Sequence, residues 1–318
     1  MELKLQKEAR VGSAYSSTKI EGNRLTLNQV KDLSENKDVI GSIKDVTEVI
    51  NYLKAIDNIP KYGLKPLTDK LFLQIHKTIT SGTLENEKDC GNFRAQQVYV
   101  GKQVFQGTGF KTIVEYTPPK AEEVQSLVNE FLEWVNSPST QELNPILVAG
   151  IVHYEIARIH PFIDGNGRTA RLMASMILYK MGFDHKRMFA LDNYYDEDRA
   201  SYHAVLKRVQ TDEGDITGWL EYITEGVMVS IGKVKEAVRN LKIISVAGKN
   251  HQIELSLKQI QILEILNDKS RITNKELQAV FKISRQAILK DIKKLKELKL
   301  IQLLGKGRSV FYVLVRPD

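Results

Sequence analysis

HPFIDGNGRTAR, residues His160 to Arg171, decides the fold of this 318-residue chain. It places a histidine at the end of an apolar helix, then a loop with two glycines, and then the start of another helix. Glycines let backbone N–H groups approach an anion closely, and the dipole of the following helix favours negative charge at its N-terminus. The stretch therefore predicts an anion site in a loop between two helices.

Polar side chains of the same stretch supply the chemistry for such a site. Arg168 and Arg171 are three residues apart on the second helix, so we expect both to face the same anion. Asp164 offers hard oxygen ligands that suit a Mg²⁺ ion bridging phosphates. His160 titrates near neutral pH and can accept a proton. These groups predict a phosphoryl- or nucleotidyl-transfer site, although the residues alone do not say which phosphorus is attacked.

Outward from this stretch, the first 240 residues have a mainly helical pattern. Pro60 and Gly63 are expected to break the chain between two of the helices. Residues 91–117 are rich in Gly, Gln and β-branched or aromatic residues, which predicts a loop with a short hairpin closed by Pro118-Pro119. The expected helices are 2–20, 27–36, 41–58, 67–80, 120–136, 145–159, 166–181, 196–210 and 215–240.

The last 70 residues differ from the rest in charge. Residues 249–318 contain 15 Lys+Arg and 7 Asp+Glu, a net charge of +8, whereas the 46 Lys+Arg and 39 Asp+Glu of the whole chain give +7. The remainder is therefore close to neutral. A basic segment beside a neutral body indicates an anionic partner, most commonly nucleic acid. A solvated lysine-rich helix surface is the simpler alternative.

Residues 256–318 have the pattern of three helices followed by two strands. Helices are expected at 256–267, at 273–280 and from Ser284 to about residue 298, with Thr273 and Glu276 as a capping box for the second. Strands are expected at 301–304 and 310–315. This order resembles a winged helix-turn-helix.

In such a domain the third helix would lie in a DNA groove and the wing beside the phosphate backbone. The predicted DNA contacts are Arg285, Gln286 and Lys290 on the helix, with Lys306 and Arg308 in the wing. A winged helix used for protein contact or dimerisation is the alternative.

The stretch 160–171 also matches the motif H-P-F-x-D-G-N-G-R-x-x-R of the Fic-domain family at every fixed position, so the chain resembles a Fic protein. The resemblance implies a mainly α fold, in which a Fic-type helical bundle with a β-hairpin flap precedes a small α+β winged-helix domain. The predicted organisation is an N-terminal helical region at 1–64, a Fic core at 65–240, a linker at 241–255 and a winged helix-turn-helix at 256–318.

The family's activity would be transfer of AMP from ATP to a Ser, Thr or Tyr hydroxyl of a target protein, with self-modification and removal of AMP left open. By resemblance, His160 is the general base and Asp164 holds Mg²⁺ on the α- and β-phosphates. Arg168 and Arg171 would bind the outer phosphates. The nucleotide would also be bound by Gly165, Asn166 and Gly167, which form the anion hole, and by Thr169.

Ser17-Thr18-Lys19-Ile20-Glu21-Gly22 fits the [S/T]-x-x-x-E-[G/N] inhibitory motif of the same family. A carboxylate on Glu21 can pair bidentately with Arg171, and would then occupy the guanidinium that the ATP γ-phosphate needs. Ser17, one helical turn earlier, would face the same site. The resemblance therefore implies self-inhibition.

Contacts to the nucleotide base are predicted from two further segments. Val100, Gly101, Lys102 and Gln103 resemble the flap turn that closes over the nucleotide. Tyr202 and His203 lie where family members have a Tyr-Tyr pair, and the histidine is a departure from that pattern; Tyr202 as an ordinary core residue is the alternative. His76 and His153, within apolar helices, are expected to be satisfied core groups.

The leading hypothesis is thus an adenylyltransferase inhibited by Glu21, with ATP and Mg²⁺. The alternatives are a DNA-binding transcriptional regulator with a nucleotide-sensing Fic module, and an inert scaffold used for dimerisation, against which the intact His160 and Arg171 argue. Cys90 is the single cysteine, and the sequence has neither an apolar leader nor a membrane-length apolar run, which predicts a cytoplasmic protein. Whether it forms a homodimer is left open.

Overall fold

The structure is a computed structural model of the full chain. It describes the backbone of residues 2–315 except residues 108, 185, 212–213, 248–254, 270, 282 and 306–309. Side chains are also not described for residues 2–3, 102–106, 109–112, 211, 239–247, 257, 260, 264 and 267–269. The chain divides into two compact units, Glu2–Gly232 and Lys233–Asp318.

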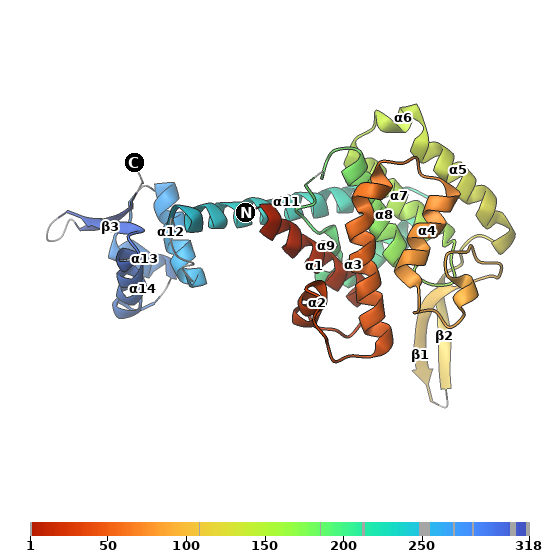
Figure 1. The fold of residues 1–318 in the computed structure, drawn as a ribbon, viewed down its shortest axis with the longest axis horizontal. Coiled ribbons are helices and arrows are strands. Elements are labelled where there is room, and N and C mark those ends of the chain that lie inside the picture. Colours follow the sequence, from red (N-terminus) through yellow and green to blue (C-terminus); the bar gives the residue numbers. More distant parts are fainter. Residues whose placement is uncertain are drawn as a thin grey trace. The chain divides into compact units, whose positions relative to one another are not determined.

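The first unit is a bundle of helices with one β-hairpin (Figure 1). Two short 3₁₀ helices, η1 (Glu87–Asp89) and η2 (Ala121–Glu123), lie in its connections. The hairpin consists of β1 (Val100–Gln106) and β2 (Gly109–Tyr116). The helices are α1 (Glu2–Ile20), α2 (Leu27–Ser34), α3 (Ile43–Gly63), α4 (Asp69–Thr80), α5 (Val124–Asn136), α6 (Pro138–Gln141), α7 (Pro145–Ile159), α8 (Asn166–Lys180), α9 (Leu191–Glu197), α10 (Arg199–Thr211) and the first part of α11 (Thr217–Ala247), which continues beyond Gly232 into the second unit.

Helix α8 forms the centre of this bundle and packs against α3, α4 and α7. Most of its side chains are buried, including both of its arginines. Aromatic rings pack beneath the loop that precedes it: the ring centroid of Phe72 on α4 lies 5.3 Å from that of Phe162 and 6.1 Å from that of Phe93. The predicted helix at 145–159 is confirmed at those residues, and the one at 166–181 ends one residue earlier.

Helix α3 continues through Pro60, contrary to the expected break. Proline lacks an N–H group, so the carbonyl four residues earlier loses its helical partner. In this structure Nη1 of Arg187 donates a hydrogen bond to that carbonyl, on Ile56, at 3.1 Å. The helix can therefore extend to Gly63 without leaving a buried acceptor unpaired.

Most other helices differ from the predicted bounds by two to four residues, and two segments differ in kind. The segment expected as one helix at 196–210 begins earlier and is divided into α9 and α10. Helix α11 runs to Ala247, so the first half of the predicted linker is helical. Most of the rest of that linker lies outside the described residues.

The predicted hairpin is confirmed. Strands β1 and β2 are antiparallel, with an irregularity between Val100 and Gly101. The end of the hairpin is fixed to the bundle, because the hydroxyl of Tyr116 donates to the carbonyl of Arg158 on α7 at 2.8 Å. Burial raises the pKa of Tyr116 to about 12, so this hydroxyl keeps its proton at neutral pH.

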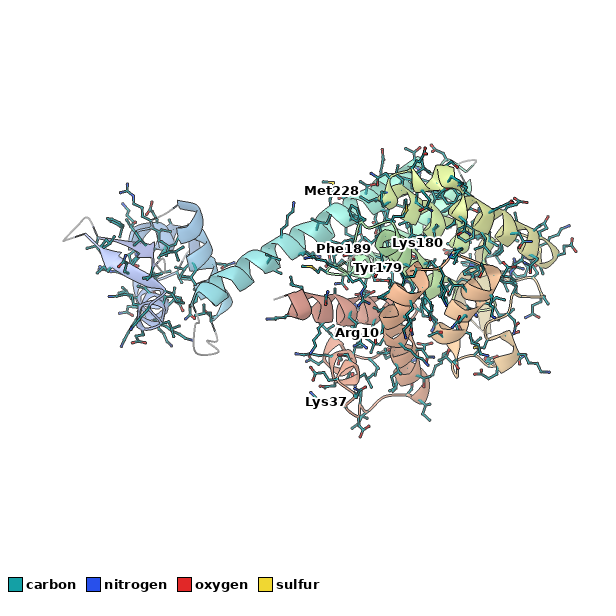
Figure 2. All side chains as sticks on the ribbon, turned by 45° about the horizontal axis from the view of Figure 1, so that its top comes forward. Arg10, Lys37, Tyr179, Lys180, Phe189 and Met228 are labelled. Carbon is teal, nitrogen blue, oxygen red and sulfur yellow. The ribbon has the colours of Figure 1, made fainter. Side chains whose placement is uncertain are left out.

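Helix α1 is attached to α3 by an arginine. Nε and Nη2 of Arg10, which Figure 2 labels, donate to the two carboxylate oxygens of Asp57 at 2.6 and 2.7 Å. The helix ends at Ile20, and Gly22 adopts a left-handed backbone with φ of 95° that turns the chain. This end of α1 carries the predicted inhibitory segment.

The second unit is a small α+β domain whose elements follow the predicted order. Hydrogen bonds between Thr273 and Glu276 form the expected capping box, and the Ser284 hydroxyl caps the third helix. A backbone pairing of Ile272 with Tyr312 joins the helical part to the ribbon. Its elements are α12 (Leu257–Lys269), α13 (Asn274–Phe281), α14 (Arg285–Glu297), β3 (Ile301–Leu304) and β4 (Phe311–Leu314).

Candidate active site

The candidate site is the loop between α7 and α8. Helix α7 ends where His160 takes a left-handed backbone, with φ of 50°, and Pro161 follows. Gly165, with φ of 80°, then begins α8. A left-handed conformation is uncommon for a residue with a side chain, and such residues often occur at functional sites. The motif therefore forms a short loop with a constrained residue at each end.

The tautomer of His160 follows from its surroundings. Its Nδ1 lies 3.2 Å from the carbonyl oxygen of Ala157, which can only accept a hydrogen bond. Nδ1 therefore carries the proton, and Nε2 keeps a lone pair. Burial lowers the pKa of His160 below its ordinary value of 6.5. The imidazole is therefore neutral at pH 7 and can act as a base.

Arg94 holds the backbone around this histidine, and the sequence analysis missed it. Its side chain is buried, and Nε donates to the carbonyl of His160 at 2.8 Å. Nη2 donates to the carbonyl of Pro119 at 2.5 Å, and the Arg94 backbone N–H donates to Pro161 at 2.9 Å. One guanidinium thus connects the motif loop with the end of the hairpin segment. An arginine in a loop is usually exposed, so nothing in the sequence indicated this role.

His76 supports the other side of the loop. Its Nδ1 accepts from the backbone N–H of Gly91 at 3.0 Å, so Nε2 is the donor to the carbonyl of Asp164 at 2.9 Å. Its ring stacks on Phe162 at a centroid distance of 3.7 Å. Burial lowers the pKa of His76 to about 4. The prediction of a satisfied core histidine is confirmed for this residue.

Asn166 has a structural use for its side chain. Its Oδ1 accepts from the N–H of Phe162 at 3.0 Å, and its Nδ2 donates to the carbonyl of Phe162 at 2.9 Å. The amide group is therefore engaged with the loop, and any contribution of Asn166 to an anion hole comes from its backbone N–H.

The N-terminus of α8 offers backbone N–H groups to an anion. The first hydrogen bond of the helix runs from Thr169 N to Gly165 O, so the three preceding N–H groups are available, as helix geometry requires. A Cβ atom placed on Gly167 would overlap Oε1 of Glu21. The carboxylate of Glu21 therefore lies against this helix end, where the predicted anion site is.

Arg171 is buried and receives its partners from several helices. Its Nη2 donates to Oε1 of Glu21 at 2.6 Å and to the carbonyl of Ser17 at 2.9 Å. Its Nε donates to the Ser17 hydroxyl at 2.8 Å, and its Nη1 to the Tyr202 hydroxyl at 3.4 Å. The predicted pairing of Glu21 with Arg171 is confirmed, as is the position of Ser17. The expected bidentate geometry was wrong, because Glu21 contacts Arg171 through one oxygen only.

The electrostatics of this pair are strongly coupled. Burial alone would raise the pKa of Glu21, but Arg171 outweighs this effect, and the pKa lies below its ordinary value. Burial alone would lower the pKa of Arg171, but Glu21 and other neighbouring groups raise it. Both side chains are therefore ionised at neutral pH. The Glu21 side chain is 34% exposed and that of Arg171 is 1% exposed, so the pair can be reached from the Glu21 side.

Arg168 pairs with other carboxylates than Arg171 does, and that both arginines face one anion stays a prediction. Its Nη1 lies 3.2 Å from Oε1 of Glu48 on α3, and its Nη2 donates to Oδ1 of Asp164 at 3.4 Å. Glu48 also accepts from Asn23, just after α1, at 3.0 Å. The spacing of two residues on a helix fixes the positions of their Cβ atoms. The position of a long arginine's guanidinium depends also on the carboxylates within its reach, here Glu48 and Asp164.

Asp164 fits the requirements of a magnesium ligand. Its side chain is half exposed, and Oδ1 accepts from the N–H of Gly165 at 2.5 Å. Of the described residues, no group of three or more His, Cys, Asp and Glu could hold a metal ion by itself. Mg²⁺ commonly uses one or two carboxylates together with substrate phosphates, so a lone exposed aspartate beside the anion site suits it.

The remaining nucleotide-site candidates have varied environments. Thr169 is fully buried, and its hydroxyl has no hydrogen-bond partner among the described residues. Tyr202 is also buried, with its ring stacked on Tyr195 at 4.7 Å, whereas His203 is exposed. The buried position of Tyr202 favours the core alternative for its ring, while its hydroxyl contacts Arg171.

His153 only partly fits its prediction. It is fully buried, and Nε2 lies 2.9 Å from the Tyr202 hydroxyl. Its Nδ1, however, has no partner within the described part of the chain. Burial lowers its pKa well below 6.5, so it is neutral.

The flap candidates lie at the start of β1. Val100 is half-buried and Gly101 is exposed, while the side chains of Lys102 and Gln103 lie outside the described residues. A Cβ on Gly101 would overlap the carbonyl oxygen of Ile113 on β2. Only glycine therefore fits at this position.

The second unit contains the candidate nucleic-acid surface. Arg285, Gln286 and Lys290 are all exposed on α14. The wing residues Lys306 and Arg308 lie outside the described residues. Of the helices within the described ranges, none has the length and apolar character needed to cross a membrane.

The fold and site define a helical bundle protein with its candidate site in a loop between two largely buried helices, followed by a helix-turn-helix unit. The Fic/DOC family profile matches residues 66–178, and an HTH domain profile matches residues 258–308. The chain therefore carries a domain of the Fic/DOC family followed by an HTH domain.

Curated relatives and solved structures agree with this assignment. The protein adenylyltransferase Fic of Drosophila willistoni is 30% identical over 226 residues, which cover 69% of this chain and 40% of the relative. The protein of the same name from Drosophila mojavensis matches to the same extent. The chain thus spans about 40% of the length of these relatives.

Among solved structures, a Fic family protein from Desulfovibrio desulfuricans G20 has a TM-score of 0.62 at 21% identity, over 99% of this chain and 89% of that chain. Fic-1 from C. elegans has a TM-score of 0.56 at 26% identity, over 71% of this chain and 62% of that chain. The likeness to the first shows the fold.

Low pH should destabilise the first unit through its buried histidines. Between the folded pKa of His76 near 4 and the unfolded value near 6.5, the unfolded chain binds more protons, so stability is complete above about pH 6.5 and falls below it. One histidine contributes a slope of up to about 1.4 kcal/mol per pH unit. We expect His76→Gln to reduce the slope of the unfolding free energy in this range.

The measurement is urea unfolding followed by tryptophan fluorescence, because both tryptophans, Trp134 and Trp219, lie in the first unit. An unchanged slope in the variant would show that His76 is charged in the folded protein.

Proposed function

We propose that this chain is a protein adenylyltransferase that its own Glu21 inhibits. The observation that carries the proposal is the lone pair on Nε2 of His160 in the same loop as an anion site at the N-terminus of α8. The names of the curated relatives support AMP transfer as the reaction. The substrates would be ATP and a hydroxyl side chain of a target protein, which includes the chain itself as a candidate.

In the proposed reaction, Nε2 of His160 takes the proton of the target hydroxyl as its oxygen attacks the α-phosphorus of ATP. The new bond joins that oxygen to the α-phosphorus, and the bond to the bridging oxygen of the β-phosphate breaks, so pyrophosphate leaves. Backbone N–H groups of Asn166, Gly167 and Arg168 would hold phosphate oxygens, whereas the N–H of Gly165, expected to share this role, donates to Asp164. Arg171 would receive the outermost phosphate once Glu21 has moved away.

Mg²⁺ would be held by Asp164 together with phosphate oxygens. When bound, it would neutralise charge on the phosphates and on the departing pyrophosphate. His76 positions the backbone of Asp164 through its Nε2–H, and the carboxylate is oriented by the Gly165 N–H. The chain's own contribution is therefore a fixed aspartate beside the amide-lined helix end.

Inhibition follows from the place that Glu21 takes. Its carboxylate lies at the helix end and pairs with Arg171, so it fills the space beside Gly167 and engages the guanidinium that a phosphate would need. Because the Glu21 side chain is 34% exposed and follows the end of α1, it can be displaced without unfolding the core. The protein would thus be slow until this carboxylate leaves.

A second function, DNA binding, is favoured by the last 70 residues. They have a net charge of +8, and α14 exposes Arg285, Gln286 and Lys290 on a helix that the HTH domain profile covers. Phosphate contacts by such residues provide sequence-independent affinity, and contacts to base edges add specificity. The same chain could then combine AMP transfer with DNA binding.

Loss of the base should abolish most of the transfer. We expect His160→Ala to reduce the rate of AMP incorporation by about 10²- to 10⁴-fold, with ATP affinity nearly unchanged. Because residue 160 has φ of 50°, His160→Asn is the matched variant: asparagine tolerates this backbone but provides no base. The wild-type rate should fall only below about pH 6.5, since the pKa of His160 is lowered. Incorporation of labelled AMP gives the rates of both variants and the pH profile of the wild type. A wild-type rate in either variant would refute the role of His160.

Removal of the inhibitory carboxylate should increase activity. A charge-assisted hydrogen bond is worth about 1.5–3 kcal/mol, so Glu21→Gly should raise AMP incorporation by about tenfold or more. Adding Arg171→Ala should cancel the gain, because the freed guanidinium is then absent. Glu35→Gly, which removes an exposed carboxylate after α2, is the control and should change nothing. Equal rates for Glu21→Gly and wild type at saturating Mg-ATP would contradict self-inhibition.

DNA binding should depend on α14. In the full chain, Arg285→Ala with Lys290→Ala should weaken binding to duplex DNA and reduce the slope of log affinity against log salt by about 2. Lys37→Ala, on the first unit and 58% exposed, is the matched control (Figure 2). Fluorescence anisotropy over a salt series gives both quantities. Unchanged affinity and slope in the double variant would place DNA binding elsewhere, and no wild-type binding at low salt would refute this function.

A further inference from the structure

Helix α9 packs beside the end of the inhibitory helix α1 and bonds to it at three points. Every third residue of α1 from Ser13 onward contacts it: the Ser13 hydroxyl donates to Asp192, the Ser16 hydroxyl donates to Asn193 at 2.9 Å, and Lys19 pairs with Asp196 at 2.8 Å. The side chains of Asn193 and Asp196 bond to Ser16 and Lys19 of α1. Asp192 differs, because it also lies beside Arg171.

The surroundings of Asp192 are almost fully closed. The residue is 1% exposed, and its Oδ2 accepts from the hydroxyl of Ser13. Its Oδ1 accepts from the hydroxyl of Tyr52 on α3 at 3.4 Å and lies 3.6 Å from Nε of Arg171. Two neutral hydroxyl donors thus fix the carboxylate in place, with one oxygen turned toward the guanidinium.

Arg171 therefore has two carboxylates on different edges of one guanidinium. Glu21 contacts Nη2, and its side chain is 34% exposed at the end of a helix. Asp192 lies 3.6 Å from Nε, whose N–H is donated to the Ser17 hydroxyl, so it acts on this edge through its charge; its side chain is 2% exposed. An incoming phosphate can displace the first without disturbing the second. A buried guanidinium whose only counter-charge had left would be costly, so the second carboxylate is the one that remains.

We propose that Asp192 is a positioning residue that holds the Nε edge of Arg171, so that the guanidinium stays aimed at the helix end beside Gly167 after Glu21 has moved away. The inference rests on the proposed function, because it assigns Asp192 to the guanidinium that would bind the outermost phosphate of ATP. Asp192 itself touches neither nucleotide nor target. It acts through Arg171, and it also ties α1 to the same guanidinium through Ser13.

The experiment compares two nucleotides in a background without inhibition. Asp192→Asn is introduced into the full-length Glu21→Gly chain, and the affinities for Mg-ATP and for AMP are measured by titration calorimetry. Since Arg171 would meet only the outer phosphates, we expect ATP affinity to fall by about tenfold while AMP affinity stays the same. Asn193→Ala in the same background is the matched control, since it removes the neighbouring contact to α1 but not one to Arg171. Its ratio of ATP to AMP affinity should equal that of the parent.

Each outcome decides the question. If Asp192→Asn leaves the ratio of ATP to AMP affinity unchanged, whether or not both affinities fall, Asp192 only stabilises the fold. If Asp192→Asn does not fold, Tyr52→Phe decides: it removes a donor to the same carboxylate and should lower ATP affinity by about threefold without changing AMP affinity. If the Glu21→Gly parent binds no ATP, the proposed function fails together with this inference. If the parent binds ATP and the ratios are equal, this inference fails alone.

Discussion

The buried positive charge of Arg171 is the constraint on which the rest of the site depends. A guanidinium keeps its charge in proteins, so burying it requires counter-charges and hydrogen-bond acceptors around its whole edge. These partners come from helices far apart in sequence: Ser17 and Glu21 from α1 and its end, Asp192 from α9 and Tyr202 from α10. The helices that pack around α8 through their apolar faces therefore also supply the partners of one side chain, and the site cannot be separated from the fold.

Arg168 is also buried and also needs counter-charges, which come from other segments. Its carboxylates are Asp164 in the motif loop and Glu48 on α3, and Glu48 in turn binds Asn23 after α1. Segments that precede the matched family region at 66–178 thus supply counter-charges to both motif arginines. The first 64 residues share the hydrophobic core and the compact unit of the motif helices, so we regard them as an integral part of the site.

The motif allowed the loop, the base and the helix end to be predicted, because each depends on local sequence. The partner of Arg171 was predictable for the same reason, since Glu21 belongs to a second recognisable motif. Asp192 and Arg94 could not be predicted: each is a single charged residue without a local pattern, and its burial depends on contacts with distant helices. The continuation of α3 through Pro60 could not be predicted either, because the donor that replaces the lost hydrogen bond is Arg187, over a hundred residues away in the sequence.

Gly101 has a consequence for how the hairpin can vary. Its Hα atoms face the carbonyl of Ile113 in a space where no side chain fits. Sliding one strand by a single residue would bring a residue with a Cβ to that place, and would also turn every side chain of the strand to the opposite face. The two strands therefore have one permitted alignment. Side chains on this hairpin can therefore be exchanged without changing which residues of the two strands lie opposite each other.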